Sequence, residues 1–252
     1  MQNFYTFEHL AKEKACHHLV TQKEQNENYA FSLALHTQEN PQAILQNRAK
    51  LQQKFPHVQF VVANQTHSAN IHIVSQAEAL GWDSLESAIE NCDALISNQK
   101  EIMLTILTAD CVPILLFDPI QNVVSAVHAG WRGTEQKILF KTIQKMQEVF
   151  NSNPNDIMAG IAPSIGKCCY EVDWNVAQHF NEISNAYDKK EDKYMLDLPT
   201  INKMQLLDAG VQEKNIEMSH ICTACEVEHY FSYRKEQGCS GRFMSMIGII
   251  SN

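Results

Sequence analysis

An α+β fold, with layered mixed β-sheets flanked by helices, is what the sequence predicts. Short apolar runs rich in β-branched residues outnumber the helical segments, and the two kinds do not alternate strictly along the chain. Strict alternation would favour a doubly wound parallel sheet, so its absence favours mixed or antiparallel sheets. The 252 residues contain no internal repeat and no linker rich in proline or glycine, so we expect one domain over residues 1–252.

Predicted strands are short, apolar and rich in valine, isoleucine or threonine. They are residues 60–63, 71–74, 93–97, 102–107, 112–117, 123–127, 157–162 and 243–250. Asp118 and Pro119 supply the turn between two of these strands, because both residue types favour turns.

Predicted helices show apolar residues three and four positions apart, or a residue that caps a helix end. They are residues 41–54, 134–150, 173–180 and 198–209. The segment 134–150 has the clearest apolar stripe, with Thr134 at its start, and Gly210 ends the last helix. Residues 184–193 are almost all polar, so we expect an exposed loop there.

The composition and net charge of the chain argue against two classes of binding partner. The chain is 44% hydrophobic and 19% charged, as in a folded globular protein, and its formal net charge is −9. A negative charge opposes a phosphate backbone or an anionic membrane, so we expect neither nucleic acid nor membrane as partner. Because no run is long and apolar enough to cross a bilayer and no export signal opens the chain, we expect a cytoplasmic protein with reduced cysteines.

Three side chains able to bind a metal follow strand-like runs: His67, Cys111 and His128. One predicted strand and a turn separate the last two, so adjacent strands would bring them to the same end of a sheet. Two imidazoles and a thiolate suit zinc better than magnesium or calcium, and three ligands leave a reactive fourth position. Two alternatives stay open: a buried cysteine beside a hydrogen-bonded histidine, and a nucleophilic Cys–His dyad.

Two further segments suggest contacts with an anion or an aromatic base. Residues 130–134 precede the clearest helix, where backbone amides and Arg132 would hold an anion; a tight turn with Arg132 paired to a carboxylate explains them equally well. Residues 231–234 and 241–242 form a basic-aromatic patch, which suits either the rim of a site or a solvated strand and loop. The loop 160–171 offers Lys167 but lacks the spacing of a Walker loop.

The other cysteines carry weaker signals. Cys222 and Cys225 have the two-residue spacing of zinc knuckles, but no second pair of that type follows. Cys168 and Cys169 are adjacent, which is awkward for one tetrahedral ion, so we interpret these four as structural or incidental. The remaining three, at positions 16, 92 and 239, are interpreted as ordinary small residues of the core or of loops.

The segments 64–67, 108–119, 126–134, 160–172 and 222–245 together resemble the successive motifs of the YfiH-type, or laccase-domain, purine nucleoside phosphorylases. The order of motifs spans roughly residues 60–250, and a weaker match covers residues 32–51. Two departures are the replacement of a glycine-rich Thr-Arg-x-Gly-Gly stretch by residues 21–25, and Ser68 where a glycine commonly follows the first histidine.

This resemblance implies layered mixed sheets similar to the YfiH and cytotoxic necrotizing factor catalytic fold. It implies zinc held by His67, Cys111 and His128. The implied reactions are phosphorolysis of adenosine, inosine and methylthioadenosine, and deamination of adenosine. The partners are therefore purine nucleosides and phosphate, with a monomer or homodimer left open. Copper, as in older descriptions of the family as polyphenol oxidases, fits less well because no further histidine-rich motifs are present.

Roles follow as hypotheses from that chemistry. Asp110 is the first candidate for proton transfer and Glu171 the second, while phosphate is expected at Arg132 with Lys167 or Arg234. Gln65 and Tyr170 complete the expected substrate-binding set. Alternatives from other classes are a metal-free cysteine hydrolase or deamidase using Cys111 and His128, a laccase-like oxidase, and a non-catalytic protein in which zinc only stabilises the fold.

Overall fold

Two large β-sheets lie face to face in the computed structural model, which describes residues 4–76, 80–238 and 240–251. The five-stranded sheet has the order β1-β2-β14-β6-β3 and the six-stranded sheet the order β13-β9-β7-β8-β5-β4. The first comprises β1 (Phe4–Tyr5), β2 (Cys16–Thr21), β3 (Gln59–Val62), β6 (Ile102–Thr108) and β14 (Phe243–Ile249). The second comprises β4 (Ile71–Ile73), β5 (Ala94–Ser97), β7 (Val112–Asp118), β8 (Val123–Ala129), β9 (Met158–Ile161) and β13 (Ile216–Met218).

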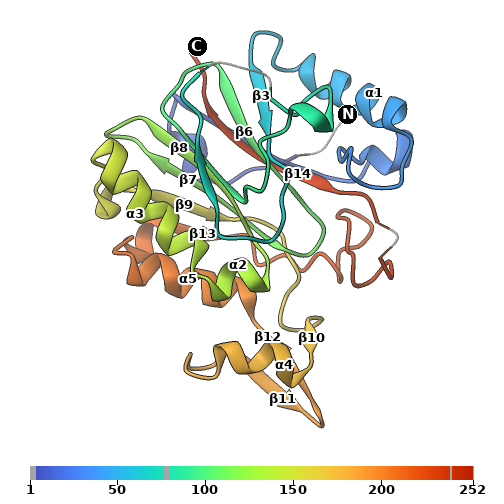
Figure 1. Ribbon diagram of the computed structural model, residues 1–252, viewed down its shortest axis with the longest axis vertical. Helices are drawn as coiled ribbons and strands as arrows, with labels where there is room; N and C mark the ends of the chain where they lie inside the picture. Colours follow the sequence, from blue (N-terminus) through green and yellow to red (C-terminus); the bar gives the residue numbers. More distant parts are fainter. Residues whose placement is uncertain (1–3, 77–79, 239, 252) are drawn as a thin grey trace.

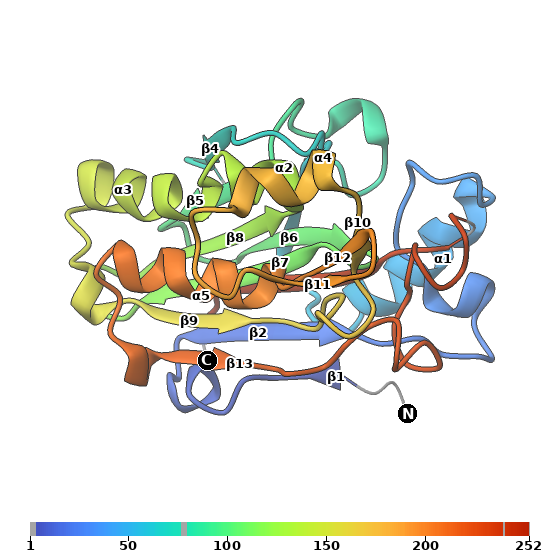
Figure 2. The same cartoon turned by 90° about the horizontal axis from the view of Figure 1, so that it is seen from below.

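Both sheets are mixed, as the sequence predicts. β3 runs parallel to β6, and β4 and β13 run parallel to β5 and β9, while the other pairs are antiparallel. Helices cover the two outer faces, so the predicted α+β class is confirmed. α1 lies on the opposite side of the strands from α3 (Figure 1, Figure 2).

The helices and the small sheet have the following bounds. The α-helices are α1 (Pro41–Gln52), α2 (Trp131–Glu135), α3 (Ile138–Phe150), α4 (Trp174–Ala177) and α5 (Leu198–Asp208). The short 3-10 helices are η1 (Leu10–Lys12), η2 (Asn28–Phe31), η3 (Leu85–Ser87), η4 (Pro154–Asp156), η5 (Gln178–Phe180) and η6 (Glu213–Asn215). The three-stranded sheet contains β10 (Glu171–Val172), β11 (Tyr187–Lys190) and β12 (Lys193–Leu196), and with α4 it forms a lobe at one end of the molecule (Figure 1).

Alternating side chains divide the core into layers. In β7, Leu115 and Phe117 point between the two sheets, whereas Ile114 and Leu116 point toward α3 and α5. These four side chains are at most 1% exposed. Because each such burial stabilises the fold by about 1.5–3 kcal/mol, the two-sided burial explains why the central strands are continuous apolar runs.

Two predicted elements differ from the structure. The helix expected over 134–150 is two helices, α2 and α3, because Lys137 adopts a left-handed conformation with φ of 60° that interrupts the backbone hydrogen bonds. The loop expected over 184–193 is wrong, since these residues form most of the β11–β12 hairpin. Within the expected loop, β11 exposes three charged side chains, so it lacks the apolar alternation by which a strand is detected in sequence.

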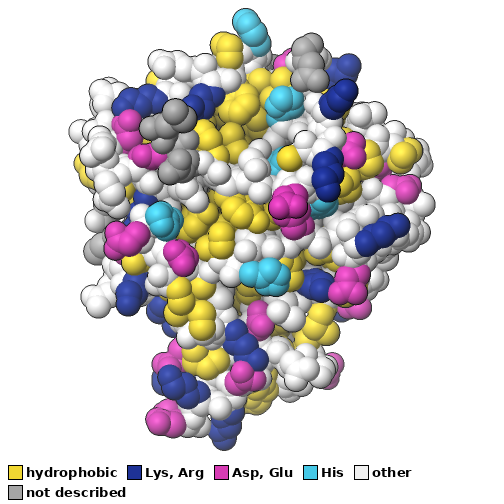
Figure 3. Space-filling view, turned by 180° about the vertical axis from the view of Figure 1, so that it is seen from behind, with side chains coloured by type: hydrophobic (Ala, Val, Ile, Leu, Met, Phe, Trp, Pro, Cys, Tyr) yellow, Lys and Arg dark blue, Asp and Glu magenta, His cyan; other side chains and the backbone are white. Residues whose placement is uncertain are grey.

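Among the residues that the structure describes, none of the helices is both long and apolar enough to span a bilayer. Acidic and basic side chains are interspersed over the face seen in Figure 3. On that face they do not gather into one continuous basic band.

Candidate metal centre

The candidate centre forms where the chain passes from one large sheet to the other. β6 ends at Thr108 and β7 begins at Val112, so a three-residue link carries Asp110 and Cys111 between the sheets. Asp110 has a φ of 89°, a conformation that few non-glycine residues adopt and that turns the chain sharply. Val112 pairs with Ala129 in β8, which places the neighbouring His128 beside Cys111.

His67 reaches the same place from the loop between β3 and β4. Its Nε2 lies 3.7 Å from the Sγ of Cys111, and its ring centroid lies 4.9 Å from that of His128. One ligand atom from each of these three residues lies within 4.8 Å of the other two. Tetrahedral zinc with ordinary bond lengths separates a sulfur from a nitrogen ligand by about 3.6 Å, so the spacing fits a zinc ion.

A buried carboxylate stands behind the three ligands. Asp93, at 0% exposure, accepts a hydrogen bond from His128 Nδ1 at 2.7 Å, which leaves the other ring nitrogen free for a metal. The same carboxylate accepts bonds from the backbone amides of His67 and Ser68 at 3.0 and 2.7 Å. Carboxylate–histidine pairs of this kind orient metal ligands. Sequence reasoning missed Asp93; the available signal was an acidic residue directly before an apolar strand.

His128 stabilises the charged forms of Cys111 and Asp93, and these two groups stabilise the charged form of His128. Burial raises the pKa of Cys111, but the charge of His128 and hydrogen bonds from His128 and His67 outweigh it and lower the pKa to about 6. Burial lowers the pKa of His128, but Cys111 and Asp93 outweigh it and raise the pKa to about 9. Likewise, His128 outweighs burial and lowers the pKa of Asp93 to about 2. Cys111 is thus held as a thiolate, the form that binds metals and also the form that attacks as a nucleophile.

Gly130 lets the backbone approach the ligands closely. A Cβ at this position would lie 2.9 Å from His67 Cδ2 and 3.1 Å from Cys111 Sγ. Any larger residue would therefore displace one of the two side chains. His67 is exposed whereas His128 is buried, so the centre is open to solvent on the His67 side.

Asp110 ties a distant segment to the centre. Its two carboxylate oxygens accept hydrogen bonds from Thr223 Oγ1 and from the backbone amide of Arg234, each at 2.7 Å. The side chain is 7% exposed. This candidate for proton transfer already uses both oxygens, and its two bonds bring the residues after β13 beside Cys111.

Tyr170 lies within electrostatic reach of Cys111 on one side and of two arginines on the other. Burial raises the pKa of Tyr170, the charge of Cys111 adds to that rise, and Arg234 and Arg132 oppose it. The guanidinium of Arg234 lies 5.3 Å from the centre of the Tyr170 ring and donates to the carbonyl of Glu171 at 2.6 Å. The two arginines thus supply positive charge beside the Tyr170 phenol.

Arg132 lies in α2, and the guanidinium stacks over Trp131 at 4.4 Å. The side chain is exposed. Because α2 has only five residues, the segment after Gly130 offers little of the helix dipole on which the expected anion site depended. The contribution of the helix dipole to an anion site here is therefore small, and Arg132 is the charged group that the segment offers.

Two candidate residues are engaged elsewhere. Gln65 donates through Nε2 to the carbonyl of Leu107 at 2.9 Å and accepts from its amide at 2.8 Å, which fixes the loop that carries His67. Lys167 forms an ion pair with Asp188 of β11 at 2.6 Å. Substrate contact by either side chain requires these partners to be exchanged.

Arg242 was missing from the predicted site, although its segment belongs to the basic-aromatic patch noted in the sequence. Burial lowers its pKa, while the negative charges of Cys111 and Asp110 act in the opposite direction. The position follows from β14, whose first residue, Phe243, pairs with Thr108 at the end of β6. The patch therefore supplies a third arginine near the centre.

The four cysteines interpreted as structural or incidental form a second cluster. Cys168, Cys169, Cys222 and Cys225 bring their sulfur atoms within 4.8 Å of one another, although adjacent cysteines were judged awkward for one ion. By contrast, Cys16 and Cys92 are buried, as expected for core residues, and Cys239 lies outside the described residues.

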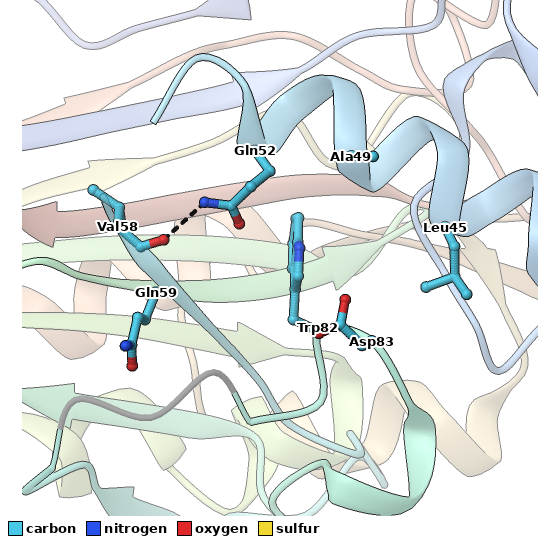
Figure 4. Close-up of a pocket in the computed structure, with 7 residues that line it drawn as sticks. All are labelled: Leu45, Ala49, Gln52, Val58, Gln59, Trp82 and Asp83. Atoms are coloured by element: carbon cyan, nitrogen blue, oxygen red, sulfur yellow. Dashed lines mark hydrogen bonds between the residues drawn. The ribbon is translucent and has the colours of Figure 1, made fainter. Parts of the chain in front are cut away.

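A pocket of about 420 Å³ lies between α1 and β3, and it shares no lining residue with the metal centre (Figure 4). Gln52 donates to the carbonyl of Val58 at 2.9 Å on one wall, and Trp82 lies between that wall and Asp83 (Figure 4). Among the described residues that line this pocket, Asp83 is the only one with a side chain of metal-binding chemistry.

Comparison with known proteins identifies the family. The family model described as "Multi-copper polyphenol oxidoreductase laccase" matches residues 17–250. The chain belongs to this family. Its similarity to purine nucleoside phosphorylase YlmD of Bacillus subtilis (strain 168) is 32% identity over 228 residues, covering 87% of this chain and 82% of that protein. Adenosine deaminase RL5, from an unknown prokaryotic organism, is 35% identical over 189 residues, covering 72% of each chain.

The fold comparison agrees. The crystal structure of hypothetical protein YfiH from Bacillus licheniformis superposes with a TM-score of 0.87 at 32% identity, covering 93% of this chain and 92% of that one. Both the resemblance to YfiH-type proteins and the predicted fold class are therefore confirmed. The two relatives found by sequence are both named as enzymes that process nucleosides.

Proposed function

We propose that the chain is a zinc-dependent purine nucleoside enzyme. It would catalyse phosphorolysis of adenosine, inosine and methylthioadenosine, and deamination of adenosine. The observation that carries the proposal is the three-ligand centre of His67, Cys111 and His128, which is open to solvent on one side. Tyr170 and Arg242 lie within electrostatic reach of its thiolate. Relatives named for these two classes of reaction support it.

The donor set fits zinc. Two imidazoles and a thiolate match its preferred ligands, and the buried Asp93 is a carboxylate of the kind that orients a histidine ligand. Bound there, the ion supplies a Lewis acid that activates water or polarises a substrate oxygen. Among the described residues only two groups are placed to hold a metal and only this one contains histidine, so a centre of several coppers lacks ligands.

The chain's own residues account for the remaining requirements. Arg132 and Arg234 bind the phosphate, and the guanidinium of Arg234 is already positioned by Tyr170 and by the Glu171 carbonyl. Tyr170 keeps its proton because burial raises its pKa, so its hydroxyl donates a hydrogen bond to the base or ribose. Asp93 holds the proton on Nδ1 of His128.

Asp110 and Glu171 stay the proposed groups for proton transfer. Each oxygen of Asp110 accepts one hydrogen bond, from Thr223 or from the Arg234 amide, and keeps a second lone pair that can take a proton. Glu171 is partly exposed in β10, at the entrance to the small lobe. Comparing Asp110→Asn with Glu171→Gln therefore tests which carboxylate the reaction uses: the essential one shows a fall in kcat with the metal content unchanged.

The test is incubation of the purified protein with adenosine, with and without phosphate, followed by chromatography for adenine, inosine and hypoxanthine. We expect adenine only when phosphate is present, because phosphorolysis consumes it. We expect inosine even when phosphate is absent, because deamination does not need it. Elemental analysis of the same sample gives the metal. A zinc-loaded protein that turns over no purine nucleoside under either condition contradicts the proposal.

A metal-free cysteine hydrolase or deamidase is the second candidate, favoured by the low pKa of Cys111 beside His128. Activity that resists a chelator but disappears with a thiol reagent would select it. Oxygen uptake with a phenol and copper in the purified protein would instead select the oxidase for which the family is named.

A further inference from the structure

Four cysteines outside the candidate centre come from two loops that lie side by side. Cys168 and Cys169 follow β9, and Cys222 and Cys225 follow β13. The loops are joined because Ser164 pairs with Cys222 in a parallel bridge and accepts a hydrogen bond from the amide of Thr223 at 3.0 Å. The fold therefore fixes the backbone of both loops, independently of anything bound to the sulfur atoms.

The sulfur atoms have the spacing of ligands to one ion. Cys225 Sγ lies 3.7 Å from Cys168 Sγ and 3.5 Å from Cys169 Sγ, and all four lie within 4.8 Å of one another. Four sulfurs bound tetrahedrally to zinc at about 2.3 Å lie about 3.8 Å apart. A disulfide needs about 2.05 Å, so the sulfurs are spaced for an ion between them.

The backbone around the cluster is built for close approach. The amide of Gly166 donates to Cys222 Sγ at 3.2 Å, the contact by which backbone amides stabilise metal-bound sulfur. A Cβ at Gly166 would lie 3.2 Å from Cys222 Cβ and 3.3 Å from Cys168 Sγ. A side chain at this position therefore competes with the sulfurs for the same space.

A turn explains how adjacent cysteines serve one ion. The amides of Cys169 and Tyr170 both donate to the carbonyl of Gly166 at 3.0 Å, so this stretch is coiled. Adjacent side chains of a strand point to opposite faces, whereas those of a coiled turn diverge by far less. Cys168 and Cys169 can thus face the same point.

We propose that Cys168, Cys169, Cys222 and Cys225 bind one zinc ion in a closed four-thiolate site. Tetrahedral coordination by four sulfurs is typical of zinc, and it leaves no position for a substrate. A cluster of several irons needs its ligands spread around more than one metal, which the mutual spacing within 4.8 Å does not allow. Partial exposure of the cysteines gives the ion a path to the site.

This zinc positions the candidate centre. Tyr170 directly follows Cys169, and Thr223, between Cys222 and Cys225, donates to the carboxylate of Asp110 beside Cys111. Joining the two loops therefore fixes the phenol and the link that carries the thiolate. The four cysteines act as positioning residues because they act on the candidate centre through Tyr170 and Thr223.

The experiment counts zinc in full-length protein purified under reducing conditions. We expect two zinc ions per chain in the wild type, one in Cys111→Ala, one in the double variant Cys222→Ser/Cys225→Ser, and none when these substitutions are combined. Cys16→Ala is the matched control, because Cys16 is a buried cysteine outside both clusters, and it should keep both ions. Failure of the nucleoside reaction leaves this count unchanged, so the two proposals fail separately.

A second measurement avoids substitutions in the cluster itself. Cobalt(II) added to metal-free Cys111→Ala should produce thiolate-to-cobalt charge-transfer absorption and the intense visible bands of tetrahedral cobalt, both abolished by one equivalent of zinc. No thiolate absorption, or no zinc retained in Cys111→Ala, would overturn the proposal. A disulfide between Cys225 and Cys168 or Cys169, found by mass spectrometry of the freshly reduced and repurified protein, would overturn it too.

Discussion

The two cysteine-containing clusters differ in the atoms that they offer to a metal and in the coordination positions that they leave for a substrate. The centre of His67, Cys111 and His128 mixes nitrogen with sulfur, lies where the chain crosses between the large sheets, and is supported by a buried carboxylate. The other cluster uses four sulfurs from two loops and is supported by a backbone amide. Three donors leave room for a reaction, whereas four complete the coordination of zinc.

The clusters are connected through short stretches of chain. One sequence step separates Cys169 from Tyr170, and one hydrogen bond separates Thr223 from Asp110. A change in the closed cluster should therefore weaken the reaction indirectly, while a change in the open centre should leave the closed cluster intact. Each substitution below tests that asymmetry.

Cys111→Ala should have the largest effect. Removing the thiolate leaves two imidazoles for the ion, so we expect loss of one zinc and a fall in nucleoside turnover of about 10²–10³-fold, the scale of losing a preorganised charge-stabilising group. Elemental analysis and the chromatographic assay measure the two effects. Cys92→Ala, which removes another buried cysteine, is the control for loss of a thiol. Zinc content equal to that of the wild type would refute the assignment of Cys111 as a ligand.

Cys222→Ser/Cys225→Ser should mainly lower stability. An ion that binds only the folded state stabilises it by about 4 kcal/mol when its concentration is a thousandfold above the Kd. Urea unfolding with and without a chelator measures this: the wild type should lose stability on chelation, and the variant in the Cys111→Ala background should not. A chelator-independent midpoint in Cys111→Ala itself would show that the four thiolates hold no ion.

Asp93→Asn should weaken only the open centre. The amide no longer stabilises the proton on Nδ1 of His128 by charge, and loss of such a partner typically costs 10–100-fold in metal affinity. Competition with a coloured chelator measures the affinity of each of the two ions. We expect the ion bound by the four cysteines to keep its affinity, whichever of the two ions binds more tightly. Equal weakening of both ions would mean that Asp93 acts on the whole fold.

The sequence indicated the cluster of His67, Cys111 and His128 better than the cluster of four cysteines. The reason is that strands position the first cluster and loops position the second. Cys111 and His128 flank continuous apolar strands, so their meeting follows from strand pairing. The role of Asp93 could not be predicted because its hydrogen-bond partners lie 25 or more residues away in the sequence. Hydrogen bonds between residues so far apart in the sequence produce no periodic pattern. Cys168 and Cys222 meet only through a bridge between loops, which no strand or helix period indicates.

Arg132→Ala should separate phosphate binding from metal binding. Removing one exposed guanidinium that pairs with phosphate should raise the KM for phosphate about tenfold, a cost of about 1.4 kcal/mol, with little change in deamination. Zinc content should stay at the wild-type value. Lys145→Ala, which removes an exposed cation of α3, is the matched control. Equal losses of phosphorolysis and deamination would count against a phosphate role.

The two glycines give the finest comparison, because each allows the backbone to approach one cluster. In Gly130→Ala the new methyl meets His67 at 2.9 Å, whereas in Gly166→Ala it meets Cys222 Cβ at 3.2 Å. The first contact forces a ligand to move, and the second needs a shift of only a few tenths of an ångström. We therefore expect Gly130→Ala to weaken zinc at the open centre several-fold and Gly166→Ala to weaken the other ion less. The reverse order would mean that the His67 loop yields more easily than the joined cysteine loops, although the amide–sulfur bond and the parallel bridge act only on the latter.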